Sequence, residues 1–211
     1  MQKTLYGPFP YTPITQRPKL EWPNGARVAL WVIPNIEYFL FNHGMPGDEN
    51  QRPNPNAAHP DVRRWSQREY GNRVGVWRIM EVLARYEVPA TVALNSLICE
   101  THPQIMHAAM KLDWEFMGHG QTNTKRTTEV PDAHAEIKAT LDGIEKFTGK
   151  RPVGWLGPGL EETWNTLDYL VEEGVQYVAD WVVDDQPFVM HLDGGKRIVS
   201  IPYSYDTNDS A

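Results

Sequence analysis

The sequence predicts an α/β protein in which helices cover a mainly parallel sheet. Short apolar runs alternate with stretches whose apolar residues recur at helical spacing, and regular strand–helix alternation is typical of parallel sheets. In addition, residues 35–39 read NIEYF after the first apolar run, where a dinucleotide-binding fold would have a Gly-rich turn. This second observation disfavours a nucleotide-binding fold. An open twisted sheet and a closed barrel both fit the pattern.

The chain divides into an N-terminal arm and one domain. Residues 1–25 carry prolines at five positions, which disfavours regular structure, so we expect an extended arm. Residues 26–211 then form a single (β/α) domain. Within it, residues 40–64 are rich in Pro, Asn and Gly. Loops of this length inside compact domains are more often functional or interface-forming than idle.

Six strands and four helices are predicted within the domain. The first strand is expected to be buried, because residues 27–35 form a nearly continuous apolar run. The helices are predicted from apolar residues at helical spacing and from glycines that follow their last turns. The predicted strands are 27–35, 89–95, 114–120, 153–159, 175–181 and 197–204, and the predicted helices are 69–86, 101–112, 132–147 and 162–173.

Composition limits the partners and the location. The 211 residues include 27 acidic and 20 basic side chains, for a net charge of −7, which disfavours nucleic acid and anionic membranes as partners. No apolar stretch approaches the ~20 residues of a membrane span, and the N-terminus lacks the apolar region of a secretory signal. Cys99 is the only cysteine, so an intramolecular disulfide is impossible. These features predict a cytoplasmic protein.

Polar residues follow the predicted strands at their C-terminal ends, where chemistry gathers in parallel barrels. On one rim they would form a cup with one imidazole and several carboxylates, which is typical of hydrolases in general terms. Each also has a structural interpretation, such as an ion pair, a bond to a backbone carbonyl or a cap. The residues are Asn35, Glu37, Tyr38, Asn95, His119, Asn123, Gly157, Gly159, Asp180, Trp181, Asp184 and Asp185.

The order of these features resembles the polysaccharide deacetylase superfamily, also called the NodB-homology fold. The resemblance is closest to the branch that contains the metal-independent allantoinases and related cyclic-amide hydrolases. It implies a distorted, incomplete (β/α) barrel. The matching stretches are NIEYF (35–39), GHGQTNT (118–124), GWLGPG (154–159), DWVVDDQPF (180–188) and PYSYDTND (202–209).

The resemblance also implies roles for individual residues. In the deacetylases the first strand ends in a catalytic Asp and a metal-binding Asp, and the third supplies two metal-binding histidines. Here Glu37 and Tyr38 take the first two places, and His119 and Asn123 take the others. A phenol and a carboxamide are poor zinc donors. Glu37 and His119 would therefore be catalytic without a cofactor.

Zinc is the alternative cofactor, held by His119 with Asp180 or Asp185. The expected substrate is a small amide, ureide or cyclic imide, held by the residues at the other strand ends. Those residues are Tyr38, Asn123, Gly157, Gly159, Trp181, Asp184 and Asp185.

Two further functions remain open at this point. One is a metal-dependent N-deacetylase of acetylated sugars. The other is a non-catalytic subunit that a partner chain completes, because members of the superfamily continue past the Asp-x-Asn-Asp element with one or two more βα units. We therefore expect a homo-oligomer or a completing partner chain, and exposed apolar surface at an open edge of the sheet.

Overall fold

The computed structural model describes residues 6–45 and 60–208 of the chain. Their strands form one sheet in the order β1-β2-β3-β4-β5-β7-β6. Neighbouring strands are parallel except for the antiparallel pair β6 and β7. The strands are β1 (Asn35–Ile36), β2 (Thr91–Leu94), β3 (Glu115–Gly118), β4 (Gly154–Trp155), β5 (Tyr177–Val178), β6 (Phe188–His191) and β7 (Arg197–Ser200).

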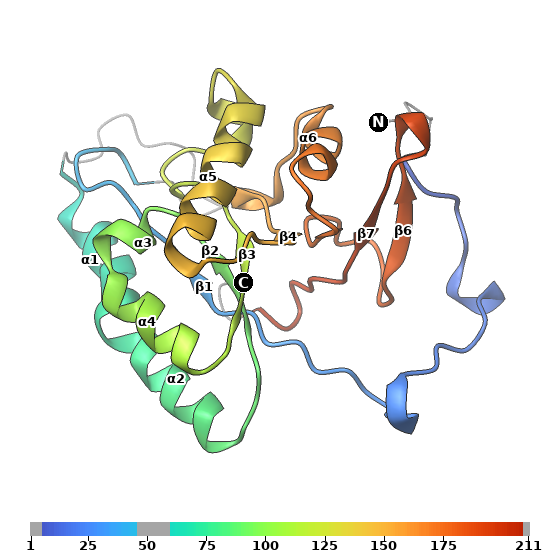
Figure 1. The fold of residues 1–211 in the computed structure, drawn as a ribbon, viewed down its shortest axis with the longest axis horizontal. Coiled ribbons are helices and arrows are strands. Elements are labelled where there is room, and N and C mark those ends of the chain that lie inside the picture. The colour runs from blue at the N-terminus through green and yellow to red at the C-terminus, as the bar shows by residue number, and fades with distance from the viewer. Residues whose placement is uncertain (1–5, 46–59, 209–211) are drawn as a thin grey trace.

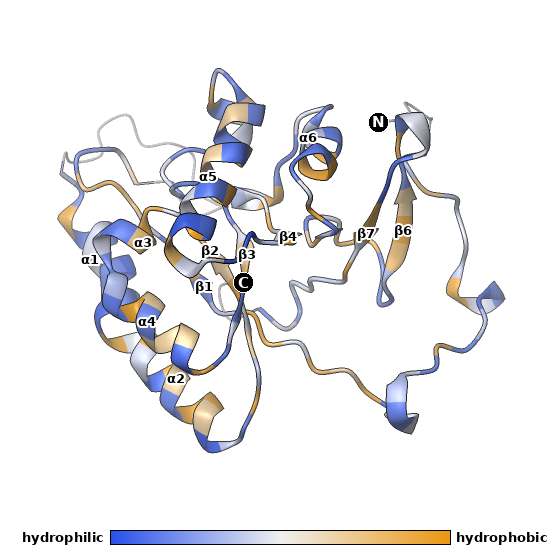
Figure 2. Cartoon of the chain, in the orientation of Figure 1, coloured by the Kyte–Doolittle hydropathy of each residue, from blue (hydrophilic) through white to orange (hydrophobic). Residues whose placement is uncertain are grey.

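Helices cover the outside of this sheet (Figure 1). They are α1 (Val62–Tyr70), α2 (Val76–Arg85), α3 (Ile98–Thr101), α4 (Pro103–Lys111), α5 (Ala133–Thr148) and α6 (Thr166–Glu172). Figure 2 shows polar and apolar residues mixed around these helices, as expected for elements with one face on the core and one in solvent. The predicted open, mainly parallel α/β architecture is confirmed. None of the described helices is long and apolar enough to cross a membrane.

Two differences from the prediction concern the strands. The first predicted strand is wrong over most of 27–35, because this run lies at the sheet edge: Val28 and Leu30 are 78% and 75% exposed, and only β1 and an isolated bridge at Val32 pair with the sheet. A strand at 188–191 was missed. It is an antiparallel partner of β7, joined by the turn Asp193–Gly195.

The helices also differ from the prediction in their bounds. The helix expected at 69–86 begins earlier, because the side chain of Asp61 caps α1 by accepting from Arg64 N. It then continues through a π turn, Gly71–Gly75, into α2. The helix expected at 101–112 is confirmed as α4, which begins at Pro103, and the short helix α3 precedes it and is separated from it at His102. The helix expected at 132–147 is confirmed as α5.

The inner face of the sheet is filled at the N-terminal ends of its strands. The ring of Tyr177 lies where a side chain at residue 154 would point, so only Gly154 fits there. Tyr177 donates to Glu115 Oε1 at 3.0 Å, and its ring meets Trp31 edge-on. Trp31 in turn donates to Thr91 Oγ1 at 2.9 Å. Because side chains fill the N-terminal ends of the strands, we expect a site at the C-terminal ends.

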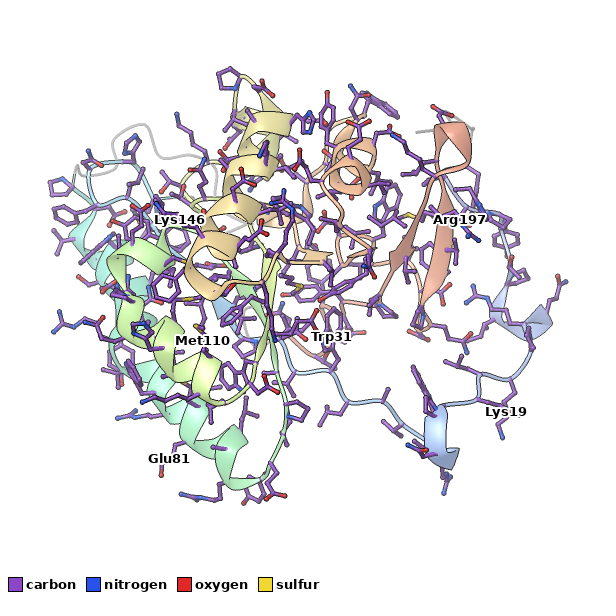
Figure 3. The ribbon with its side chains drawn as sticks, in the orientation of Figure 1. Lys19, Trp31, Glu81, Met110, Lys146 and Arg197 are labelled. Atoms are coloured by element: carbon purple, nitrogen blue, oxygen red, sulfur yellow. The ribbon has the colours of Figure 1, made fainter. Side chains whose placement is uncertain are left out.

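The described part of the arm runs from β6 back to β1 on the open side of the sheet (Figure 1), and Lys19 marks its far side in Figure 3. The carbonyl of Pro8 accepts from His191 N at 2.8 Å. Phe9 packs edge-on against Trp181 and Phe188. Arg17 forms an ion pair with Asp184 at 2.5 Å. The arm is therefore attached near β6 through contacts of its residues 8–17.

The packing of β3 against β4 predicts the effect of one methyl group. A Cβ at Gly118 would lie 2.7 Å from the fully buried ring of Trp155. Gly118→Ala should therefore lower the free energy of unfolding by about 1–3 kcal/mol, measured by urea denaturation. Gly75→Ala is the control, since nothing lies within 4 Å of its Cβ position, and it should not destabilise. Equal stability of the two variants would contradict this packing.

Candidate active site

A pocket of about 270 Å³ lies at the C-terminal ends of the strands. Six of the residues singled out in the sequence come together in its wall, and Arg68, Arg126 and Tyr205 join them. Tyr38, Trp181, Asp184 and Asp185 are not in this wall. The lining residues are Asn35, Glu37, Phe39, Arg68, His119, Asn123, Arg126, Leu156, Gly157, Pro158, Gly159, Leu160, Tyr203, Tyr205 and Asn208.

His119 follows β3 directly and is only 3% exposed. Its Nδ1 lies 2.6 Å from the carbonyl oxygen of Leu156, which can only accept, so Nδ1 carries a hydrogen. Its Nε2 faces the pocket, 3.4 Å from Glu37 Oε1 and 3.3 Å from Asn123 Nδ2. The histidine therefore makes both the backbone bond of the structural interpretation and a contact with the second predicted catalytic residue.

A chain of amide hydrogen bonds sets the state of this imidazole. The backbone N–H of Tyr38 donates to Asn95 Oδ1 at 2.7 Å, which leaves Asn95 Nδ2 as the donor to the carbonyl of His119. Asn95 Nδ2 also donates to Asn123 Oδ1 at 3.1 Å. Asn123 must then present its own NH2 group to His119 Nε2. The neutral tautomer with a lone pair on Nε2 follows.

In this tautomer, two bases lie next to each other in the wall of the pocket. Glu37 Oε1 and His119 Nε2 can each act as a hydrogen-bond acceptor, and these two atoms are 3.4 Å apart. A carboxylate and an imine nitrogen so placed repel slightly unless a proton donor lies between or beside them. A water molecule or an N–H group of a ligand is such a donor. The pair can therefore orient and deprotonate water.

A buried asparagine holds the backbone of Glu37. Asn72 Nδ2 donates to the Glu37 carbonyl at 2.9 Å. Asn72 lies within the π turn between α1 and α2, and such turns are frequent at functional sites because they redirect side chains. Sequence reasoning missed Asn72, and the only signal was the pair of glycines, Gly71 and Gly75, that bounds the turn.

One buried carboxyl group, that of Asp180, and one half-buried carboxyl group, that of Glu162, lie behind the pocket wall. Asp180 accepts from Gly157 N at 2.6 Å, and Glu162 accepts from Trp181 Nε1 at 2.8 Å. Burial raises the pKa of Asp180 from 3.8 to about 6, and the Gly157 N–H partly opposes this. Burial and the negative charge of Asp180 raise the pKa of Glu162 well above its usual value. Sequence reasoning missed Glu162, which it assigned to a helix.

The remaining predicted site residues lie elsewhere. The ring of Tyr38 packs on the core cluster around α2 and α4, edge-on to His102. Trp181 and Asp184 line a second pocket, of about 600 Å³, between the arm and β6. Asp185 is exposed. Gly157 reaches the first pocket, but its N–H is engaged by Asp180. Pro158 has no N–H, so Gly159 offers the next peptide N–H along this loop.

The donor set does not fit a catalytic zinc ion. Such sites use three protein ligands from imidazole, carboxylate or thiolate groups. Within residues 6–45 and 60–208, no three His, Cys, Asp or Glu side chains gather closely enough to hold a metal. In addition, the Nε2 lone pair of His119 already accepts from Asn123. We therefore derive no chemical step through a metal.

The sequence matches the family model of polysaccharide deacetylases over residues 65–178. The chain belongs to the polysaccharide deacetylase family. A putative polysaccharide deacetylase of Schizosaccharomyces pombe is 22% identical in an alignment of 223 positions, gaps included, which covers 89% of this chain and 66% of that protein. A peptidoglycan deacetylase of Helicobacter pylori is 22% identical over 66% of this chain and 48% of that protein. The chain thus spans about half to two thirds of these relatives.

Solved structures of the family share the fold over a longer part of the chain than the family model matches. The Puue allantoinase superposes with a TM-score of 0.75 at 26% identity, covering 90% of this chain and 66% of the allantoinase. A probable polysaccharide deacetylase from Pseudomonas aeruginosa PAO1 superposes with a TM-score of 0.76 at 26% identity, covering 92% and 68% of the two chains. The resemblance inferred from the motifs is confirmed, and the family is one of carbon–nitrogen bond hydrolases.

The buried carboxyl pair predicts a pH dependence of stability. Because folding raises the pKa of Asp180 from 3.8 to about 6, the folded protein binds a proton that the unfolded chain has released between these values. This contribution is complete below pH ~4 and is lost as the pH rises through ~6, by up to about 3 kcal/mol. Asp180→Asn should remove it.

Urea denaturation of both proteins between pH 4.5 and 8 measures this effect. The difference between the two free energies of unfolding cancels the groups that do not interact with Asp180 and leaves the titration of the coupled Asp180 and Glu162. The Asn side chain is uncharged at every pH tested. Curves that run parallel across the range would show that Asp180 is not protonated in the folded state.

Proposed function

We propose that this protein hydrolyses a non-peptide C–N bond of a small amide, ureide or cyclic imide, without a catalytic metal, and that Glu37 and His119 are the catalytic residues. The observation that carries the proposal is the facing pair of bases, Glu37 Oε1 and His119 Nε2, 3.4 Å apart in the wall of a pocket. The likeness to an allantoinase supports the ureide class of substrate.

The geometry suggests how the two bases share a water molecule. The carboxylate of Glu37 takes one proton as the water oxygen bonds to the substrate carbonyl carbon. The second hydrogen of the water donates to His119 Nε2, which orients the attacking lone pair. The carbonyl oxygen becomes an oxyanion, for which the backbone N–H of Gly159 is the candidate donor. The C–N bond then breaks as Glu37 passes its proton to the leaving nitrogen.

The Asn123 amide keeps the imidazole in the required state. By donating to His119 Nε2 from one side, it favours the tautomer in which this nitrogen accepts. A histidine in the opposite tautomer would donate a hydrogen bond to Glu37 and so lower the basicity of this carboxylate. The role proposed for Asn123 is therefore to position His119, in addition to lining the pocket.

Replacing the proposed base tests this mechanism. Glu37→Gln keeps the shape of the side chain and removes its basicity, so kcat/KM should fall about 10²–10⁴-fold. Turnover is measured on a panel of hydantoin, allantoin and dihydrouracil by release of the ring-opened acid. Glu81→Gln is the control, since Glu81 lies on α2 at the surface, paired only with Arg85 (Figure 3). Unchanged turnover in Glu37→Gln would refute the assignment.

Metal removal tests the second half of the proposal. Because the donor set around His119 is unsuited to zinc, dialysis against a strong chelator should leave kcat unchanged. Elemental analysis of the protein before and after dialysis shows whether any ion was removed. Loss of one equivalent of zinc together with activity, and recovery of both on adding zinc back, would favour the metal-dependent deacetylase instead.

A further inference from the structure

Within the part of the chain that the structure describes, the charge of the pocket residue Arg68 has no acidic partner. It lines the wall with Glu37 and His119. Its guanidinium carbon lies 4.6 Å above the ring of Phe39. Across the described residues, its side chain has no hydrogen bond and no ion pair. The contrast is with Arg126 in the same wall, which forms an ion pair with Glu161.

A guanidinium that lines a pocket and has no acidic partner among the described residues points to a ligand. A guanidinium has five N–H donors and stays charged. The other half-buried arginines bind carboxylates, as Arg17 does with Asp184 and Arg151 with Glu173. The ring of Phe39 covers one face of the Arg68 fork and holds its plane. Its N–H edge is then available to an acceptor that enters the pocket, and a carboxylate matches two of these donors at once.

Arg68 does not serve to neutralise the proposed base. No ion pair within 4 Å joins Arg68 to Glu37, although both side chains line the pocket. Glu37 instead faces His119. The pocket thus holds a carboxylate and a guanidinium that stay apart, which leaves each one free to act on a different part of a ligand.

One helical segment fixes both groups relative to each other. Arg68 is in the last turn of α1, and Asn72 follows one turn later and holds the Glu37 carbonyl. The separation between the base and the guanidinium is therefore set by helix geometry, which limits how a substrate can lie. The pocket volume of about 270 Å³ suits a small molecule.

We propose that the substrate carries a carboxylate beside its scissile C–N bond and that Arg68 binds this carboxylate as the specificity-determining residue. The proposal rests on the hydrolase function given above. It narrows the substrate class from small ureides and amides in general to their acidic members. The helix that holds the base in place would thereby also select the charge of the substrate.

Binding of a matched pair of probes tests the proposal. Hydantoin-5-acetate and hydantoin-5-acetamide have nearly the same shape and differ in charge. Isothermal titration should show that the full chain binds the acetate at least about tenfold more tightly. Arg68→Met keeps the contact with Phe39 and should abolish the preference. Arg63→Met, an exposed site on the same helix, should retain it.

Two outcomes overturn the proposal: a wild-type protein that does not prefer the acetate, or an Arg68→Met variant that keeps the preference. Arg68→Lys keeps the positive charge but loses the planar set of N–H donors, so it should retain part of the preference. This variant replaces Arg68→Met if Arg68→Met does not fold. Turnover of both probes separates the two proposals. Arg68-dependent binding without hydrolysis would sink the hydrolase function alone, and hydrolysis indifferent to Arg68 would sink only the carboxylate site.

Discussion

The site depends on the side-chain amide of Asn95. This residue directly follows β2, which lies between β1 and β3 in the sheet, and it is fully buried. Its oxygen accepts from Tyr38 N after β1, and its nitrogen donates to the His119 carbonyl after β3. One amide thus ties the ends of three strands together. Since a buried amide without partners costs about 1–3 kcal/mol, these bonds also hold the orientation of Asn95.

The orientation of Asn95 has chemical consequences in the pocket. It fixes the direction of the Asn123 amide, and Asn123 in turn directs an N–H to His119 Nε2. The hydrogen bond from the backbone N–H of Tyr38 to Asn95 thus determines, through the Asn123 amide, which tautomer His119 adopts. In the deacetylases with a His-x-x-x-His pair, the position of Asn123 carries a metal ligand. Here the same position supplies a donor, which accounts for the hydrolysis proposed without a metal.

Much of the pocket was predictable because parallel strands present their C-terminal ends at one edge. Glu37, His119 and Asn123 come together for this reason, and the sequence shows each at a strand end. Trp181 and Asp184 also follow a strand, yet they lie in another pocket. The partner that draws Asp184 away is Arg17, 167 residues earlier, and no local pattern reveals such a contact.

The helical contribution to the site was not predictable from spacing. Arg68 reaches the pocket because α1 begins at Val62, after the Asp61 cap and before the predicted start of the helix, and Asn72 holds the Glu37 carbonyl from within the π turn. A π turn shifts the phase of the following residues, so an ideal helical wheel places them on the wrong face. The antiparallel strand β6 was missed for a related reason. Its Phe188–His191 run is short, and its identity comes from pairing with β7.

The tautomer of His119 is the central claim, and nitrogen NMR measures it directly. Two-bond proton–nitrogen correlation spectra of labelled protein at neutral pH distinguish a protonated from an unprotonated ring nitrogen, and His119→Gln identifies the signals. We expect a protonated Nδ1 and an unprotonated Nε2 in the unliganded protein. An Nε2–H tautomer, or a doubly protonated ring, would contradict the hydrogen-bond chain through Asn95 and Asn123, and with it the shared-water mechanism.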